Sequence, residues 1–328
     1  MNSSRSRPVR FVSGGMSFPG DGRMLRGPGR QEASAPMSST DQSMTPSILD
    51  LINRTLELPT LPDVLVKLNE VMNDPESSAE EVANVISLDP AVSTNILRIV
   101  NSAYYGLQVR VGSVNLAVSI MGFNMTRKVA LKAAVFSVFA KKSNKKVPNF
   151  DPNTFWQHSI YTGILARTIG HSSQKFTGLH PEDLYICGLL HDIGKIILVE
   201  NAPENFNEIL RVGLEENRNL LELEQEILGF THADVGSVLA IKWFLPEDLT
   251  IAIRYHHCPD RDPFNKTLSS LVALSDALAA KNGKPALSKA RYEDPDPELY
   301  EIVGVQEEDL GALIEKANEE YARSEIGW

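Results

Sequence analysis

The sequence has few cysteines and no long apolar run, and each shortage excludes a class of protein. Two cysteines, Cys187 and Cys258, among 328 residues cannot form a disulfide framework, so we expect a reducing compartment. No apolar segment approaches the roughly 18–20 residues needed to span a bilayer. The amino terminus also lacks the uninterrupted apolar core of a secretory signal. We therefore expect a cytoplasmic protein with no membrane-embedded part.

Basic residues are outnumbered by acidic residues outside the amino-terminal region. The formal net charge is −10, although residues 1–45 carry six arginines against three acidic residues. The remainder is therefore strongly acidic, and an acidic surface repels the phosphates of nucleic acids. A local basic run, KKSNKK at 141–146, is typical of a solvated loop. Nucleic acid is thus an unlikely partner.

Residues 1–44 are poor in large apolar side chains, with Leu25 as their single leucine. A segment rich in Ser, Gly, Pro and Arg buries too little apolar surface to offset the entropy lost on ordering. We predict that residues 1–44 are disordered. An organelle transit peptide is the alternative interpretation of this Arg-rich leader.

Alternating strand patterns of any length are absent, whereas apolar residues at helical spacing recur from Thr45 onward. The sequence predicts an all-α fold with a domain at 45–285, whose two helical halves, 45–140 and 154–285, are joined by a polar hinge. A capping box at Ser78–Glu81 begins one helix. Others are expected at 113–121, 124–140, 154–170, 181–198, 203–217, 219–228, 231–243, 246–256 and 264–281. Residues 286–328 are predicted to form a linker and an amphipathic helix that packs back on the domain.

Histidine is absent from the first half, and all seven histidines lie in the second. Several of them, with two aspartates, fall on apolar helix faces or at helix ends. A single inward histidine is usually a hydrogen-bonded core residue, but so many are difficult to satisfy in pairs. Imidazole and carboxylate groups are common ligands of divalent metals. The candidate metal ligands are His158, His191, Asp192, His232, His256, His257 and Asp276.

The sequence is also compatible with alternatives to a metal site. His171 and His180 flank a Gly-rich turn and are predicted to lie on the surface, and Cys258 is a weaker candidate ligand. A helical scaffold without metal is a further hypothesis. Other chemistries lack their motifs, since the sequence has no HExxH helix and no GxSxG elbow. The spacing from Gly188 to Lys195 also differs from that of a phosphate-binding Walker loop.

The order H…HD…H…HH…D on a helical scaffold resembles the HD superfamily of metal-dependent phosphohydrolases. The first half, LELPTLPDVLVKLNEVMNDPESSAEEVANVISLDPAVSTNILRIVNSAYYG, is similar to the HDOD domain. Its specific parts are the LP-x-LP opening, the Asp-Pro before a helix and the NSAYYG ending. The resemblance covers roughly residues 50–285. It implies a two-part all-α HDOD architecture with an HD-type helical bundle in the second half.

HDOD domains are bacterial signalling modules, mostly treated as non-catalytic relatives of the HD-GYP cyclic-di-GMP phosphodiesterases. The resemblance places the candidate ligands at the HD-GYP ligand positions and implies one or two divalent ions: Fe, Mn, Zn or Mg. It also implies that Asp192 bridges two ions and that Lys195 faces a substrate phosphate. Two departures count against catalysis. The segment HHCPDRDPFNK replaces the HHE…GYP stretch of the HD-GYP proteins. Thr154 occupies the position where some trinuclear relatives have a glutamate ligand.

Two hypotheses from different classes follow. The first, which the HDOD half and the missing GYP stretch favour, is a signalling module that acts through protein or ligand binding and retains an HD-type metal site. Its expected partners are signalling proteins, including those of cyclic-di-GMP pathways. The second is a metal-dependent phosphohydrolase acting on a cyclic dinucleotide, with Asp192 and Lys195 as catalytic residues. In such enzymes metal ions lower the pKa of a bridging water and polarise the phosphate.

Overall fold

The computed structural model describes residues 52–53, 56–58, 63–74, 76–101, 105–139, 147–287 and 294–325. Residues 46–328 form one compact unit. The described ranges contain helices and no strand, which confirms the all-α prediction. The predicted disordered segment 1–44 and the basic run 141–146 lie outside the described residues.

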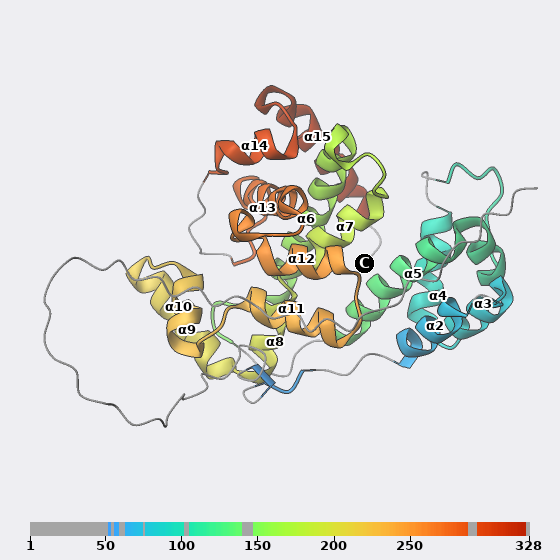
Figure 1. The fold of residues 1–328 in the computed structure, drawn as a ribbon, viewed down its shortest axis with the longest axis horizontal. Helices are drawn as coiled ribbons and strands as arrows, with labels where there is room; N and C mark the ends of the chain where they lie inside the picture. The colour runs from blue at the N-terminus through green and yellow to red at the C-terminus, as the bar shows by residue number, and fades with distance from the viewer. Residues whose placement is uncertain are drawn as a thin grey trace, which may run out of the picture. The chain divides into compact units, whose positions relative to one another are not determined.

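Among its described residues the first half includes the helices α2 (Asp63–Asn73), α3 (Ala79–Ser87), α4 (Pro90–Val100) and α5 (Val114–Phe139) (Figure 1). The predicted capping box is present, because Ser78 accepts from the Glu81 N–H while the Glu81 carboxylate accepts from the Ser78 N–H. Gly122 interrupts α5 with φ 74° and ψ 166°. This kink separates the two helices that the sequence predicts near 113–121 and 124–140.

The second half begins at Asp151, which caps α6 (Pro152–Ser172). The helices that follow are α7 (Pro181–Leu190), α8 (Ile193–Asn201), α9 (Pro203–Glu216), α10 (Leu220–Leu228), α11 (His232–Lys242), α12 (Glu247–Tyr255), α13 (Lys266–Lys281), α14 (Pro297–Val303) and α15 (Leu310–Glu325). Short 3-10 turns occur at Gln174–Phe176, Pro259–Arg261 and Glu307–Asp309. None of the described helices is both long enough and apolar enough to cross a membrane.

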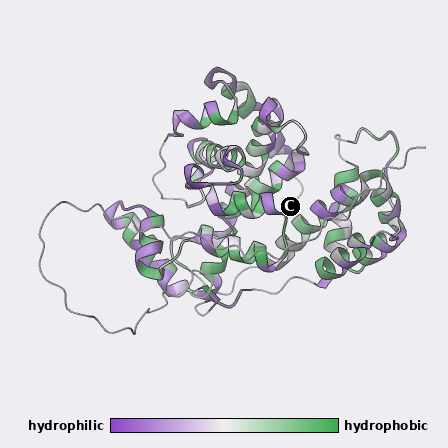
Figure 2. Cartoon of the chain, in the orientation of Figure 1, coloured by the Kyte–Doolittle hydropathy of each residue, from purple (hydrophilic) through white to green (hydrophobic). Residues whose placement is uncertain are grey.

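Helix α6 is the centre of the second half and packs on α7, α13 and α15, while α11 packs on α8 and α12. Most of α6 is buried all round. The helices of the first half are instead amphipathic, and Figure 2 shows hydrophobic and hydrophilic residues alternating along them. As predicted, the last helix packs back on the domain, where the Tyr161 hydroxyl donates to Asn318 Oδ1 at 2.6 Å.

One predicted helix, 181–198, is wrong in detail. The structure divides it at His191 and Asp192, between α7 and α8, and Gly194 is helical. Gly194 is needed for packing rather than for a turn, because a Cβ built there would lie 1.9 Å from the His232 carbonyl oxygen. The corner at residues 191–192 allows two adjacent side chains to face the same region.

Several polar contacts join the first-half segments to the second half. Lys128 Nζ on α5 lies 2.6 Å from Asp183 Oδ1 on α7. Lys242 Nζ donates to the Leu58 carbonyl oxygen at 2.7 Å, and the Glu57 N–H donates to Asn201 Oδ1 at 3.2 Å. The buried apolar side chains also form one cluster that runs through both halves.

Candidate metal centre

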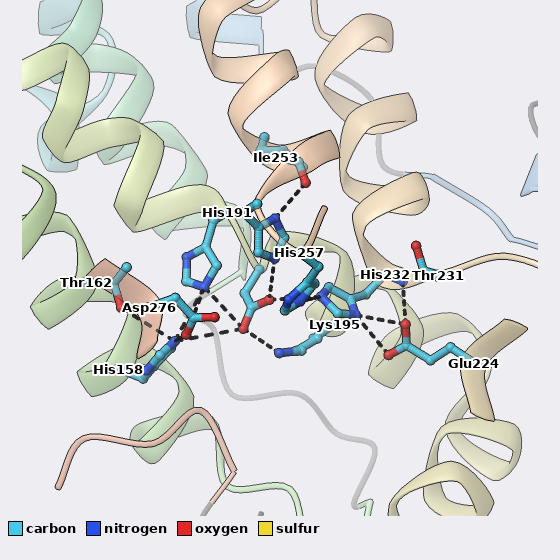
Figure 3. A network of polar contacts seen from close by, with 12 residues as sticks. His158, Thr162, His191, Lys195, Glu224, Thr231, His232, Ile253, His257 and Asp276 are labelled. Atoms are coloured by element: carbon cyan, nitrogen blue, oxygen red, sulfur yellow. Dashed lines mark hydrogen bonds and ion pairs between the residues drawn. The ribbon is translucent and has the colours of Figure 1, made fainter. Parts of the chain in front are cut away.

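The seven predicted ligands come together from five regions of the second half (Figure 3). His158 lies on α6, and Asp276 lies on α13. His191 and Asp192 occupy the corner between α7 and α8, and His232 begins α11 behind its cap Thr231. His256 and His257 follow the end of α12. The side chains form two adjacent groups, each of which holds candidate ligand atoms within 4.8 Å of one another.

Close backbone packing of α6 on α7 sets the position of the first group. A Cβ at Gly188 would lie 2.7 Å from the Thr162 carbonyl oxygen, and one at Gly163 would lie 2.8 Å from the Tyr185 carbonyl oxygen. Only glycine at these crossings allows the two helices to approach so closely. The approach places His158 and His191 side by side at the carboxyl end of α7.

The first group consists of His158, His191 and Asp276. Nε2 of His158 lies 3.4 Å from Nε2 of His191 and 3.1 Å from Asp276 Oδ1. Nε2 of His191 lies 3.8 Å from the same Asp276 oxygen. Both histidines are fully buried, and Asp276 is 22% exposed. One carboxylate therefore faces two imidazole nitrogens.

The second group consists of Asp192, His232, His256 and His257. Asp192 Oδ1 lies 3.1 Å from Nε2 of His232 and 3.6 Å from Nε2 of His256. Nε2 of His257 lies 3.0 Å from Nε2 of His232. The other oxygen of Asp192, Oδ2, faces His191 of the first group at 3.5 Å and Lys195 Nζ at 2.5 Å. Asp192 thus lies between the two groups.

Hydrogen bonds to Nδ1 fix how the buried rings face the site. Nδ1 contacts a backbone carbonyl oxygen in three of them: Lys284 for His158, Gly188 for His191 and Ile253 for His256, all at 2.7–2.8 Å. A carbonyl oxygen only accepts, so Nδ1 carries the hydrogen and Nε2 of the neutral ring presents a lone pair. In His232 the Nδ1 acceptor is the Glu224 carboxylate at 2.8 Å. Such contacts are the usual support of metal-binding histidines.

The charge states also suit a cation. Burial opposes ionisation of Asp192, but Lys195 and His191 hold its pKa well below the usual range. Burial lowers the pKa of His256 to about 4, so this ring is neutral at pH 7. Burial likewise opposes protonation of His232, yet Glu224 raises its pKa to about 8. Metal binding therefore displaces a proton from His232 at neutral pH.

The spacing of the ligand atoms fits metal coordination. Bonds of about 2.0–2.2 Å to one ion place neighbouring ligand atoms about 3.0–3.5 Å apart, because tetrahedral and octahedral geometry set that ratio. The sequence alone did not exclude the hypothesis of a helical scaffold without metal. Two buried atoms argue against it, since Asp192 Oδ1 and His256 Nε2 have no hydrogen-bond partner of acceptable geometry. Unpartnered buried polar atoms are costly, and a cation would satisfy both.

A pocket of about 760 Å³ opens beside the two groups. His232, His256, His257, Asp276 and Lys195 form its floor, and residues of α9, α10, α13 and α14 form its walls. Lys195 is buried and paired with Asp192, and its amine points toward the cluster in Figure 3. The pocket gives a ligand direct access to the candidate metal centre.

Glu224 is a site residue that the sequence analysis missed. It is 1% exposed and accepts hydrogen bonds from both the backbone N–H and Nδ1 of His232. A signal was available, since Glu224 shares the apolar stripe of Leu220, Leu223 and Ile227 on one face of α10. Of the two histidines predicted to lie on the surface, His171 is exposed, whereas His180 is half-buried and caps α7. Cys258 lies outside both groups.

The fold and the site define an all-helical domain with a buried cluster of histidines and aspartates. The sequence model of the HDOD domain matches residues 58–259, and the chain therefore belongs to the HDOD family. An uncharacterised protein of Treponema pallidum (strain Nichols) is 29% identical over 233 residues, which cover 70% of this chain and 43% of that protein. The chain thus spans less than half the length of this relative.

Solved structures show the same fold. An HDOD domain protein of unknown function from Geobacter sulfurreducens aligns with a TM-score of 0.64 and 22% identity, over 83% of this chain and 96% of that one. A protein from Shewanella amazonensis SB2B, provisionally named a phosphohydrolase, aligns with a TM-score of 0.61 and 27% identity. The alignment covers 82% of this chain and 93% of that one. A protein from Marinobacter aquaeolei VT8, provisionally named a signal transduction protein, aligns with a TM-score of 0.64 and 23% identity. The alignment covers 83% of this chain and 59% of that one.

Proposed function

We propose that this chain is an HDOD signalling module that holds one or two divalent metal ions and acts by binding partner proteins. The convergence of the seven ligands, with two buried atoms among them that make no hydrogen bond, carries this proposal. Imidazole-rich ligand sets suit Fe and Zn, and the carboxylates add affinity for Mn, whereas Mg prefers oxygen ligands alone. We therefore expect Fe, Zn or Mn in preference to Mg.

The charge of the pocket favours a module over a phosphodiesterase. Two of its described lining residues are cationic, and both are already paired: Lys195 with Asp192, and Arg218 with Glu226. From outside the lining, Lys266 pairs with Asp260 and Glu298, and Lys281 pairs with Asp294. Carboxylates at the mouth of a pocket repel a phosphodiester substrate. The lining acids are Asp260, Asp276, Asp294, Asp296 and Glu298.

Metal analysis and partner binding test the proposal together. We expect the purified protein to contain metal, to lose it to a chelator, and to hydrolyse neither cyclic dinucleotides nor phosphomonoesters. Asp192→Asn should remove the metal, because Asp192 contacts both groups. Asp183→Asn, which changes an acid on α7 outside the site, is a matched control. Protein without metal after reconstitution with Fe²⁺, Zn²⁺ and Mn²⁺ would refute the proposal.

The partners expected for such a module are signalling proteins, including those of cyclic-di-GMP pathways. Capture of partners by the metal-loaded protein, compared with the chelated protein and with Asp192→Asn, tests this step. We expect capture to depend on metal. Equal capture by all three forms would mean that the metal centre does not control partner binding.

A metal-dependent phosphohydrolase is the second candidate, and one observation favours it. The two oxygens of Asp192 face different ligand groups, as a carboxylate bridging two ions would. The Shewanella relative with the phosphohydrolase name adds support. In such an enzyme bound metal would activate water and polarise the phosphate, and Lys195 would hold Asp192 in place. Metal-dependent turnover that Lys195→Met and Asp192→Asn both abolish would establish this function over the first.

A further inference from the structure

Glu224 is a buried acid with an unusual set of contacts. Its side chain is 1% exposed, and every hydrogen bond that the structure gives it goes to His232. Oε2 accepts from the His232 backbone N–H at 2.7 Å and contacts Nδ1 at 2.8 Å. Figure 3 shows Glu224 on the side of His232 that faces away from the other ligands. A buried carboxylate held by one histidine requires a compensating positive charge at that histidine.

The two hydrogen bonds act on different parts of His232. Residue 232 is the first residue of α11, so its N–H has no partner within the helix, and Glu224 supplies one. The contact with Nδ1 fixes the ring so that Nε2 faces Asp192 at 3.1 Å. A carboxylate on Nδ1 also makes Nε2 a stronger metal ligand. Glu224 therefore determines both where α11 begins and how its first side chain faces the site.

Glu224 belongs to a helix that has little other attachment to the metal centre. Helix α10 packs chiefly on α9, and α9 packs on α8. The two helices lie side by side in Figure 1, joined by Asn217 in the left-handed conformation. Both line the pocket. We call the segment from Pro203 to Leu228 the α9–α10 hairpin. Its polar link to the ligand cluster is the Glu224–His232 pair.

We infer that Glu224 is a positioning residue that couples metal occupancy at His232 to the α9–α10 hairpin. The inference rests on the proposed function, for which it supplies a regulated surface. Metal at Nε2 fixes the orientation of the His232 ring, and the ring in turn holds Glu224 and the helix that carries it. The hairpin is therefore attached to α11 more firmly when metal is present than when it is absent. Partner proteins would bind differently to the metal-loaded and metal-free forms of the hairpin.

Co²⁺ binding with hydrogen exchange tests the inference. Co²⁺ is the probe metal because its visible spectrum reports on the orientation and basicity of its ligands. In Glu224→Gln we expect Co²⁺ affinity to fall about 10–100-fold, as for other supporting carboxylates, and the spectrum to shift. Saturating Co²⁺ should protect amides of the α9–α10 hairpin in the wild type and not in Glu224→Gln. Glu222→Gln, an exposed acid on α10, should match the wild type.

Glu224→Leu keeps the test valid if the glutamine variant folds poorly. Leucine continues the apolar stripe of α10, so the helix should pack while its link to His232 is lost. Wild-type Co²⁺ affinity, spectrum and hairpin protection in a folded Glu224 variant would overturn the inference. Wild-type protein that binds no Co²⁺ would instead refute the proposed function, so the two failures are distinguishable.

Discussion

Gly194 lies where one added carbon tests the geometry of the metal centre directly. It is in the first turn of α8 at the crossing with α11. A Cβ at this position would lie 1.9 Å from the His232 carbonyl oxygen and 2.9 Å from the Gly236 nitrogen. Real Cβ atoms essentially never approach closer than 3.0 Å, so Gly194→Ala forces that carbonyl to retreat by about 1 Å.

The retreat should affect both stability and metal binding. Overpacking of this kind costs about 1–3 kcal/mol, and the higher helix propensity of alanine offsets up to about 1 kcal/mol of it. A net loss of about 1–2 kcal/mol lowers the melting temperature of a domain of this size by about 2–8 °C. Metal ligands tolerate displacements of only about 0.2 Å, so a shift of His232 weakens metal binding as well.

Circular dichroism melts and elemental analysis measure the two effects on the same samples. Gly311→Ala on α15 is the matched control, because a Cβ there meets nothing within 4 Å. The control should melt at or above the wild-type temperature and keep its metal. If Gly194→Ala melts like the control and binds the same metal with the same affinity, the close α8–α11 crossing is not what positions His232.

Four further predictions follow from other parts of the molecule. Chelation should lower the melting temperature, because metal at 100 times its Kd stabilises the folded state by about 2.7 kcal/mol; an unchanged melt after verified removal would show that the ion is incidental. Metal affinity should fall about tenfold per pH unit below about pH 8 and level off above it, because the metal must displace the proton that His232 holds with a pKa of about 8. Titrations that show the same metal affinity at pH 6 and pH 8 would contradict this. Cys258, which is half-buried, should react with an alkylating reagent well before Cys187, which is 2% exposed and whose pKa burial raises; equal rates by mass spectrometry would be unexpected. Phe244→Gly should raise the free energy of unfolding by about 0.5–1 kcal/mol, because Phe244 is 77% exposed and has a left-handed φ of 52° that glycine adopts readily. A lower free energy of unfolding in urea would mean that the Phe244 ring stabilises the fold despite its exposure.

The sequence by itself determined the helices and the identity of the predicted ligands. Capping residues at Ser78 and Thr231 act on the backbone a few residues away, so their effect can be read locally. Polar residues on apolar stripes, such as His158 and Asp276, must face the interior whatever lies opposite them. The helical period therefore identified both as inward-facing before any partner was known.

Only the tertiary structure decided how these residues face one another. The Lys284 carbonyl that orients His158 is 126 positions away, and no local pattern connects the two. The corner at His191 and Asp192 was not predicted, and Gly194 is required by the close approach of α11 rather than by a turn. Glu224 was missed although it lies on the apolar stripe of α10, and only the structure shows that its partner is His232 on another helix. Local periodicity fixes which side of a helix is buried, but long-range packing determines which atoms meet there.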